Sequence, residues 1–574
     1  MIHKIILIVM LLFFCLETSA QINFENNTNN LGINYSPATP YLGSGVSFAD
    51  FDNDGWDDLS FASGNGQNLR FYKNNNGIFV LVSLNIGVIN YETKQINWID
   101  IDNDGDKDLF ITSATSGNKI FENLGGFNFN DITASSGFPV QNIYTNGATW
   151  GDFDNDGYID VFLSNKGATS DIIIPNYLYK NNGNGTFTDV SNSAGIDANS
   201  HQTFCAVFLD INNDGWPDIY TSTDKAYNLN QLYKNNGDGT FEEIGLPSGT
   251  NLAFNAMSTT VGDYNNDGFI DIYVTNGGDT ALLVNNGNET FSNQSVSTGC
   301  EHGGFTWGAV FLDADLDADL DLYVSSSLYN IPSINTSVFY EQLNGNLFQI
   351  PNNIGFIGDE KQSYCNAIGD INNDGYPDIV VTNGDNQTVD VWENESITSN
   401  HWLKITLEGT LSNRDGIGAI IEISINGQKQ FRQTQCGEGY LTQNSSTEFF
   451  GLGQNSTIDY VKVKWPSGVI DLLENLNADQ TMHIVENSNA LSLRDDRLSY
   501  VTVYPNPTNE TVTLQSKNSL SKVSVFNALS QKVLSRSLSQ KKHDLNLSHL
   551  KTGIYFLHIT DSESRTQIEH IIKH

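Results

Sequence analysis

The chain is organised by short apolar stretches that flank acidic turns. Stretches such as GVSF, GATW and AVFL precede the turns, and alternating stretches such as DLSFAS, DLFITS and DIYVTN follow them. Apolar and polar positions alternate with a period of two, which predicts β-strands on both sides of each turn. A second hairpin is predicted at LYKNNGNGTF (residues 178–187) and at LYKNNGDGTF (residues 232–241), where turn residues separate aromatic and aliphatic positions. Four strands in a unit of about 50 residues are typical of one β-propeller blade.

The acidic turns are seven copies of one ten-residue pattern, D-x-[DN]-x-D-G-x-x-D-[LIV]. They follow one another at intervals of 50 to 58 residues and begin at Asp50, Asp100, Asp152, Asp210, Asp263, Asp313 and Asp370. We name them acidic loops 1 to 7 and number their positions 1 to 10. Because a pattern that recurs at such an interval indicates a repeat architecture, seven copies predict seven blades.

The residue types in these loops indicate calcium binding. Side-chain oxygens at positions 1, 3, 5 and 9, together with the backbone carbonyl of position 7, suit a hard cation that takes six to eight oxygen ligands. An ordinary Asp-Gly turn needs only two such residues, whereas these loops hold 25 Asp and 3 Asn at the 28 side-chain positions. An EF-hand would need a Glu at position 12 and flanking helices, but position 12 is a strand residue such as Phe61 or Ile111. Crowded carboxylates repel one another unless a cation lies among them.

We therefore predict up to seven structural Ca²⁺ ions. The predicted ligands are Asp50, Asp52, Asp54, Trp56, Asp58, Asp100, Asp102, Asp104, Asp106, Asp108, Asp152, Asp154, Asp156, Tyr158, Asp160, Asp210, Asn212, Asp214, Trp216, Asp218, Asp263, Asn265, Asp267, Phe269, Asp271, Asp313, Asp315, Asp317, Asp319, Asp321, Asp370, Asn372, Asp374, Tyr376 and Asp378. Loop 6 has Ala318 where the other loops have Gly. A left-handed backbone would be strained at Ala318, so we expect the site in loop 6 to be weaker.

The two ends of the repeat region indicate a closed ring. The seventh unit stops near residue 394, before a fourth strand. Phe24 lies eight residues before Gly32, as Phe187 lies eight residues before Gly195. We therefore predict that residues 22–27 supply the outer strand of the seventh blade. An open solenoid needs no such exchange between its ends.

Over residues 22–398 this pattern resembles the FG-GAP or VCBS repeats of integrin-like propellers. The resemblance implies that the calcium ions are mainly structural. The predicted fold is therefore all-β, with a seven-bladed calcium-binding β-propeller followed by a small β domain and a C-terminal β-sandwich.

Residues 400–487 carry a different set of motifs. HWLKITLEG, SNRDGIGA, QFRQ, GEGYLTQNS, FGLG and VKWPSG follow one another in this order. Together they resemble the ASPIC/UnbV domain, which follows FG-GAP repeats in cartilage acidic protein and in many secreted bacterial proteins. Arg414, Arg432 and Tyr440 lie in its Gly-rich loops, where they could bind a sugar or a carboxylate. Salt bridges and turns that hold a small barrel are the favoured interpretation, and Trp465-Pro466 is interpreted as a packed strand end.

Both ends of the chain carry export features. Lys4, the apolar residues 5–16 and the small residues before Gln21 predict a signal peptide over residues 1–20. No stretch approaches the roughly 20 apolar residues of a membrane span. After a linker at residues 488–500, the motifs VYPNP, VSVFNALSQKV and DLNLSHLKTGIYFLHI resemble the type A sorting domain of the type IX secretion system of Bacteroidota. The predicted domains are 1–20, 21–399, 400–487, 488–500 and 501–574, and the protein is expected outside the cell or at its surface.

Charge excludes one class of partner. The chain has 28 Lys and Arg against 67 Asp and Glu, a formal net charge of -39. Such an acidic protein repels phosphate backbones, so we exclude nucleic acid as a partner. Residues 1–500 carry about -43 and the last 74 residues about +4, so the acidity belongs to the repeats. Cys205, Cys300, Cys365 and Cys436 are too few and too scattered for a disulfide framework, and their pairing is left open.

Three function classes fit these features. The favoured one is a secreted recognition or adhesion protein that binds glycans or cell-surface proteins through loops opposite the calcium side, such as residues 164–176 and 325–337. The alternative is a polysaccharide-processing, lyase-like enzyme, for which only His201, Glu301 and His302 are candidates. The third is a purely structural extracellular component. We assign no catalytic residue.

Overall fold

The computed structural model describes residues 22–167, 169, 172, 174–199, 201–327, 337–343, 346–352, 354–356, 359–489, 501–505, 507–516, 519–527, 532–561 and 566–573. The chain divides into two compact units, residues 1–490 and 491–574. In both units the described residues form β-strands, with two four-residue helices, α1 (Gly245–Ser248) and α2 (Ser295–Thr298). No helix among the described residues is long and apolar enough to cross a membrane. The predicted signal peptide and residues 490–500 of the predicted linker lie outside the described residues.

Six sheets of the first unit have the same plan: four strands in chain order, each antiparallel to its neighbour. They are β2 (Val46–Ala49), β3 (Asp58–Phe61), β4 (Arg70–Asn74), β5 (Phe79–Val82); β6 (Ile96–Ile99), β7 (Asp108–Ile111), β8 (Lys119–Asn123), β9 (Phe129–Asp131); β10 (Thr145–Gly151), β11 (Asp160–Asn165), β12 (Tyr177–Asn181), β13 (Phe187–Asp189); β14 (Thr203–Leu209), β15 (Asp218–Thr223), β16 (Leu232–Asn235), β17 (Phe241–Glu243); β18 (Ala256–Gly262), β19 (Asp271–Asn276), β20 (Ala281–Asn285), β21 (Phe291–Asn293); and β22 (Thr306–Leu312), β23 (Asp321–Ser326), β24 (Val338–Leu343), β25 (Leu347–Gln349).

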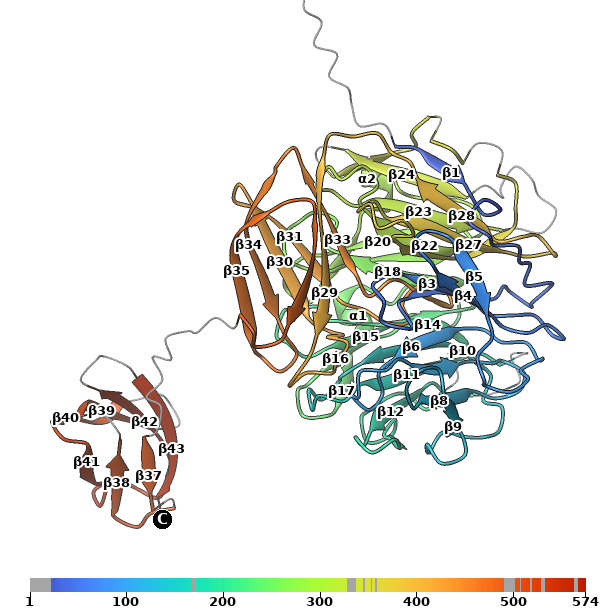
Figure 1. Cartoon of the computed structure of the whole chain (residues 1–574). Coiled ribbons are helices and arrows are strands. Elements are labelled where there is room, and N and C mark those ends of the chain that lie inside the picture. Colours follow the sequence, from blue (N-terminus) through green and yellow to red (C-terminus); the bar gives the residue numbers. More distant parts are fainter. Residues whose placement is uncertain are drawn as a thin grey trace, which may run out of the picture. The chain divides into compact units, whose positions relative to one another are not determined.

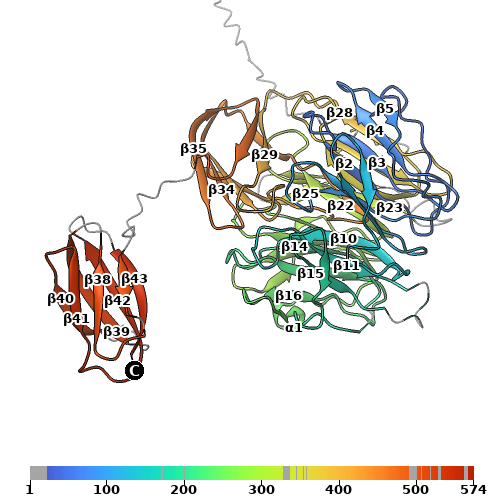
Figure 2. The same ribbon diagram turned by 60° about the horizontal axis from the view of Figure 1, so that its bottom comes forward.

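The seventh sheet joins the two ends of the repeat region. It consists of β26 (Ser363–Gly369), β27 (Asp378–Asn383), β28 (Asp390–Asn394) and, as its outer strand, β1 (Phe24–Asn26). Phe24 pairs with Asn394 in an antiparallel register, which confirms the predicted strand exchange. Figure 1 shows β27 and β28 beside the strands of the first sheet, and Figure 2 shows β28 there from another side.

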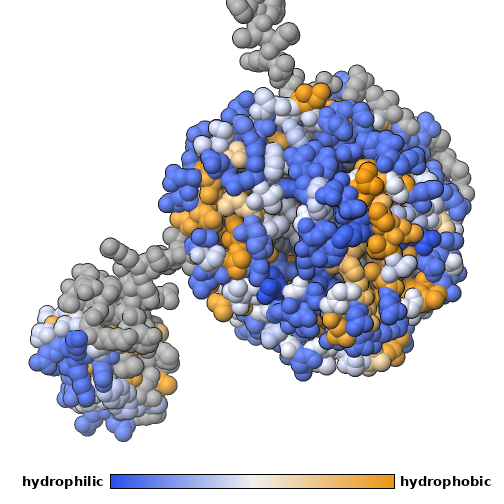
Figure 3. All heavy atoms as spheres, viewed as in Figure 1, coloured by the Kyte–Doolittle hydropathy of each residue, from blue (hydrophilic) through white to orange (hydrophobic). Residues whose placement is uncertain are grey.

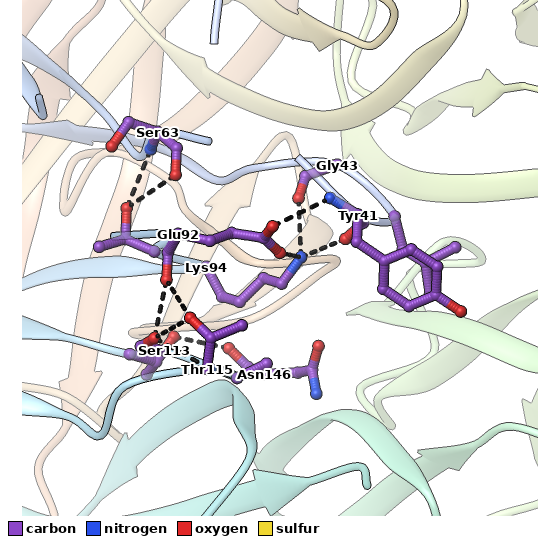
Figure 4. A network of polar contacts seen from close by, with 12 residues as sticks. Tyr41, Gly43, Ser63, Glu92, Lys94, Ser113, Thr115 and Asn146 are labelled. Carbon is purple, nitrogen blue, oxygen red and sulfur yellow. Dashed lines mark hydrogen bonds and ion pairs between the residues drawn. The ribbon is translucent and has the colours of Figure 1, made fainter. Parts of the chain in front are cut away.

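The innermost strands of the sheets are buried on both faces, and polar contacts link neighbouring sheets. Lys94, at the start of the second sheet, is almost fully buried. Its Nζ forms an ion pair with Glu92 (2.7 Å) and donates to the carbonyl oxygens of Tyr41 and Gly43 (3.2 Å from Gly43). Figure 4 shows this side chain reaching the segment that leads into β2. Burial lowers the pKa of Lys94, and the contacts hold the first two sheets together.

The outer strand β5 carries exposed apolar residues. Val80 and Leu81 are 49% and 54% exposed, whereas β9 has Asn130 and Asp131 at its exposed positions. Figure 3 shows apolar side chains gathered on the side where Figure 1 places β4 and β5. The outer strand β25 also has an exposed apolar residue, Leu347, at 49%.

The rest of the first unit forms two further sheets that share one core. The sheets are β33-β29-β36 and β31-β30-β34-β35. Trp465 is buried, and its indole N–H donates to Asp471 (2.8 Å). This agrees with the interpretation of Trp465-Pro466 as a packed strand end. The short β32 leaves these sheets and pairs in parallel with β2. The strands are β29 (His401–Glu408), β30 (Ile420–Ile425), β31 (Gln428–Gln433), β32 (Thr442–Gln443), β33 (Glu448–Gly453), β34 (Thr457–Lys464), β35 (Ile470–Asn477) and β36 (Gln480–Val485).

The second unit consists of two sheets around one apolar core, β37-β38-β41 and β40-β39-β42-β43. Val512, Val523 and Leu557 are fully buried in this core. Its strands are β37 (Thr502–Tyr504), β38 (Thr511–Gln515), β39 (Leu520–Asn527), β40 (Lys532–Ser537), β41 (Lys542–Asn546), β42 (Gly553–Asp561) and β43 (Thr566–Lys573).

Candidate metal centres in the acidic loops

Each acidic loop joins the innermost strand of a sheet to the second strand. In loop 1, Asp50 accepts hydrogen bonds from the backbone N–H groups of Asp54 (2.9 Å) and Gly55 (2.7 Å), and Asp54 accepts one from Trp56 (3.1 Å). The corresponding three bonds form in all seven loops. The local sequence therefore folds each loop around the carboxylate of position 1.

The Asp at position 9 is deeply buried in every loop. All seven are at most 1% exposed. Asp58 accepts from the backbone N–H of Phe51 (3.2 Å) and from that of Asn74 (2.7 Å), which ends the third strand. Six of the seven residues make both bonds. In loop 5, Asp271 accepts from Asn285, and its buried Oδ2 has no hydrogen-bond partner among the described residues.

The predicted ligands come together in part. In loops 1, 2 and 3, carboxylate oxygens of positions 1, 3 and 9 lie within 4.8 Å of one another, and in loop 6 those of positions 1, 3 and 5 do. In loops 4, 5 and 7, position 3 is an Asn whose amide donates to the Asp at position 5 (2.9, 3.0 and 2.9 Å). The carbonyl oxygens of position 7 stay predictions. Three carboxylates converge in four of the seven loops.

Burial makes these carboxylates difficult to ionise without a cation. Loss of solvent, together with a smaller effect of neighbouring carboxylates, raises the pKa of Asp58, Asp108 and Asp271 to about 8. In loop 6, burial and the charge of Asp317 raise the pKa of Asp319 to about 9. A divalent cation among these groups would favour their charged forms.

Loop 6 shows the strain that its sequence predicts. Ala318 has a φ of 83°, in the left-handed region, yet the loop keeps its three hydrogen bonds. The segment from Asn400 to Val485, which we name the β29–β36 segment, covers this loop. Gly453 N–H donates to the carbonyl of Leu316 (2.8 Å), and the Asn400 amide donates to that of Asp315 (2.8 Å). A Cβ at Gly451 would clash with the Asp313 carboxylate, which explains the first glycine after Phe450 in the FGLG motif.

A ring of asparagines at position 4 was not identified from the sequence. Asn53 donates from its amide to the carbonyl of Gly105, at position 6 of the next loop (2.9 Å). In loops 2, 3, 4, 5 and 7 the Asn at position 4 donates in the same way to the carbonyl of position 6 in the following loop. The last of these links Asn373 to Gly55 (3.1 Å), from loop 7 back to loop 1. Loop 6 has Leu316 at this position and cannot donate. The signal in the sequence was an Asn at position 4 of six loops.

In loops 1 and 3, a lysine of the third strand pairs with the carboxylates at positions 3 and 5. Lys73 pairs with Asp52 and Asp54 (3.0 Å from Asp54), and Lys180 pairs with Asp154 and Asp156 (2.8 Å from Asp156). In loop 4 the corresponding Lys234 instead pairs with Glu289 of the next sheet (2.5 Å). A cation this close opposes binding of a second cation.

We expect Lys73→Met and Lys180→Met to raise the calcium affinity of loops 1 and 3 by about fivefold each, because each removes a like charge a few ångströms from the metal. Competition titration against a calcium indicator measures the change. Lys234→Met is the matched control, since its partner is Glu289, and it should shift affinity less. Unchanged or weaker binding in the first two variants would contradict the expectation.

The β29–β36 segment lies against the acidic-loop side of the sheets. Lys404 is buried and donates to Asp370 (2.7 Å) and Asn373 (2.7 Å), and Lys464 donates to the carbonyl of Asn213 (3.2 Å). A cavity of about 530 Å³ lies between this segment and loops 1, 2 and 7, and both basic and acidic side chains line it: Lys107, Lys404, Arg414, Asp50, Asp57, Glu408 and Asp415.

Three residues were candidates for binding a sugar or a carboxylate. Arg414 lines this cavity, pairs with Glu408 (3.0 Å) and donates its backbone N–H to Asn103 (2.8 Å). The Arg432 guanidinium lies 5.0 Å from the centre of the Phe450 ring. Tyr440 is fully buried, so the binding interpretation is wrong for this residue because no ligand can reach it.

The candidate acid-base residues lie on separate sheets. His201 leads into β14 and pairs with Asp197 (3.0 Å). His302 leads into β22, and its Nδ1 accepts from the backbone N–H of Gly304 (3.0 Å). The sheet that begins with β18 separates them. The four cysteines of the described residues are unpaired and buried: Cys205, Cys300, Cys365 and Cys436.

Family models match three regions of the chain. A model of FG-GAP-like repeats matches residues 50–111, 100–163, 152–221, 210–274 and 263–324. A model of ASPIC and UnbV matches residues 409–491, and a model of the secretion system C-terminal sorting domain matches residues 502–574. These matches agree with the order of domains inferred from the motifs.

Curated relatives include cartilage acidic protein 1 from two species. The chain is 25% identical to that of Xenopus tropicalis over 283 residues, 45% of this chain and 41% of the relative. It is 23% identical to that of Homo sapiens over 455 residues, 74% of this chain and 60% of the relative. The chain therefore spans about half the length of these relatives.

Two solved structures show distant similarity. A lectin of Agrocybe aegerita that recognises non-reducing terminal N-acetylglucosamine is 17% identical, with 55% of this chain and 81% of the lectin covered and a TM-score of 0.35. The extracellular domain of the one-component system BT4673 from B. thetaiotaomicron is 10% identical, with 97% and 59% covered and a TM-score of 0.37.

Proposed function

We propose that this chain, a secreted protein with FG-GAP-like repeats, an ASPIC and UnbV domain and a type IX sorting domain, is a non-enzymatic recognition or adhesion module built on a seven-bladed calcium propeller. The sorting domain supports export through the type IX machinery to the cell surface or beyond. Glycans or other surface ligands are the proposed partners.

Contacts between the first and seventh sheets support a closed ring of seven blades. Besides the pairing of β1 with β28, Asn74 donates to the carbonyl of Ile371 (2.8 Å) and Thr382 to that of Ser44 (2.7 Å). Asn373 donates to Gly55 in the same direction around the ring as the other position 4 asparagines. Every sheet then has a neighbour on both sides.

The observation that carries the calcium assignment is the buried acidic pair at positions 1 and 9. In loop 5, Asp263 and Asp271 are both fully buried, and Asp271 keeps one oxygen unpaired. An unpaired buried carboxylate oxygen is unfavourable unless it binds a cation or a proton. Calcium fits the number and type of oxygen donors in the loop.

The face opposite the acidic loops is the proposed recognition surface. The ASPIC and UnbV domain covers loops on the other side, at Leu316 and Asn373 among others. On the opposite face Tyr41 and Tyr227 are 63% and 70% exposed, in the loops before β2 and after β15. Exposed aromatic rings with a polar tip suit the faces of sugar rings. Much of the two loops predicted for recognition, residues 164–176 and 325–337, lies outside the described residues.

We expect the purified mature protein to bind glycans on an array, and Tyr227→Ala to weaken that binding at least about tenfold through loss of a stacking surface. Leu81→Ala, on the outer edge of the first sheet, is the control and should bind normally. Degradation of a polysaccharide that His201→Ala and His302→Ala abolish would contradict the proposal and favour a lyase.

A further inference from the structure

One ten-residue segment of the ASPIC and UnbV domain contacts the innermost strand of all seven sheets. We name this segment, Cys436–Ser445, the hub segment. Its contacts by hydrogen bond or ring packing are, in sheet order, Ser47 in β2, Trp98 in β6, Trp150 in β10, Phe204 in β14, Thr259 in β18, Trp307 in β22 and Ile368 in β26. A segment this short can contact seven inner strands only if they surround it.

The centre of the hub segment fills the space between the sheets. Tyr440 is fully buried, its ring lies 5.5 Å from that of Phe204 and 5.1 Å from that of Trp307, and its hydroxyl donates to the carbonyl of Leu42 (2.8 Å). A Cβ at Gly437, where φ is 83°, would clash with the carbonyl of Ala148. The contact with the sheets therefore requires Gly437, the first glycine of the GEGYLTQNS motif, and Tyr440.

The side chain of Gln443 forms hydrogen bonds with the backbone of the second sheet, as a paired strand would. Its side-chain amide donates to the carbonyl of Trp98 (2.9 Å), and its carbonyl accepts from the N–H of Trp98 (2.8 Å) and the hydroxyl of Ser47 (3.1 Å). The backbone of residues 442 and 443 pairs with β2. One residue thus satisfies buried backbone groups of the second sheet while it is paired to the first.

The end of the hub segment crosses the junction between the seventh and first sheets. Ser445 N–H donates to the carbonyl of Ile368 in β26 (2.9 Å). The Ser445 hydroxyl donates to Asp57, at position 8 of loop 1 (2.8 Å). Asp57 in turn accepts from the N–H of Asp370 (3.1 Å), the residue that Lys404 also contacts. Three contacts therefore meet at this junction, in addition to the loop between β1 and β2 that joins the two sheets.

We propose that the ASPIC and UnbV domain acts as an internal ligand of the propeller, and that its hub segment closes the ring at the junction of the first and seventh sheets. The pairing of β1 with β28 inside the seventh sheet spans three residues, and contacts such as that of Asn74 with Ile371 join this sheet to the first. The hub segment adds the contacts of Ser445 with both sheets and also fills the central channel from the acidic-loop side.

The test is hydrogen–deuterium exchange of the full mature chain with the substitution Gln443→Ala. We expect amides of β1, β2, β6, β26, β27 and β28 to exchange at least about tenfold faster, because Gln443 contacts β2 and β6 directly, while those of β15, β16, β19 and β20 keep their protection. Thr457→Ala, on an exposed end of β34, is the matched control and should change neither set. Unchanged exchange at the junction, or an equal increase in every sheet, would overturn the proposal.

A milder variant keeps the test decisive if Gln443→Ala does not fold. Ser445→Ala removes the hydroxyl that donates to Asp57 and leaves the backbone contacts in place. It should raise exchange in β1, β26 and β28 about threefold or more, again with β15 and β16 protected. A response confined to residues 400–487, with the junction unchanged, would show that the segment stabilises its own domain and does not close the ring.

Discussion

Removal of calcium from the mature protein is expected to lower the midpoint of thermal unfolding of the repeat region by at least about 10 °C. Extracellular sites with dissociation constants of about 10⁻⁴ to 10⁻³ M contribute about 1.4 to 2.7 kcal/mol each at 10 mM free calcium. Up to seven such sites act on one cooperative unit, and without the ions the buried Asp58, Asp108 and Asp271 must take up protons or face one another. Calorimetry with and without EDTA measures the shift.

The second unit provides an internal control for this experiment. Residues 491–574 carry no acidic loop and form a separate compact unit, so their unfolding should not respond to EDTA. Calcium added back should restore the midpoint, and magnesium should restore less of it because it prefers strict octahedral geometry and retains its water. An EDTA-insensitive midpoint for the repeat region would contradict the metal assignment.

The repeating parts of the fold could be predicted because their signals are local. Period-two alternation around each acidic loop defined the first two strands of every blade, and the third strand was visible in LYKNN. The position of Phe24 before Gly32 was sufficient to assign β1 to the sheet that contains Asn394. These features depend on residues that are close in sequence or repeat at a fixed interval.

The contacts of the ASPIC and UnbV domain could not be predicted in the same way. Tyr440 lies in a Gly-rich loop, where binding of a sugar or a carboxylate was one interpretation, yet the partners that bury it are Phe204 and Trp307. Gln443 and Trp98 are 345 residues apart in the chain. No pattern within one segment reports such a contact, because its complement is formed by strands from seven different sheets.

In the acidic loops, too, some features could be predicted from the sequence and others could not. Their oxygen-rich positions were visible, but the dual role of position 9 was not. Its carboxylate was expected to serve as a ligand, and it is also the acceptor for two backbone N–H groups that fix the loop to the third strand. That role depends on where Asn181 ends β12, which only the folded sheet reveals.

The substitution Asp160→Ala should separate these two roles of position 9. Asp160 is fully buried and accepts from the N–H groups of Phe153 (3.1 Å) and Asn181 (2.7 Å). Its removal leaves two buried donors unpaired, at a cost of about 1 to 3 kcal/mol each. We therefore expect a loss of about 2 to 6 kcal/mol in the free energy of unfolding whether or not calcium is present. Chemical denaturation of the mature protein in calcium and in EDTA measures it.

The matched substitution is Asp156→Ala in the same loop. Asp156 is another predicted ligand, but its side chain is 35% exposed, accepts from the N–H of Tyr158 and pairs with Lys180 (2.8 Å) at the surface. It should lower stability in calcium and have little effect in EDTA, since the contacts that it loses there are one surface hydrogen bond and one exposed ion pair. If Asp160→Ala behaved in the same way, its carboxylate would matter only as a ligand. If both variants lost stability equally in EDTA, the carboxylate at position 5 would also stabilise the loop without a bound ion, and the proposed difference between positions 5 and 9 would be wrong.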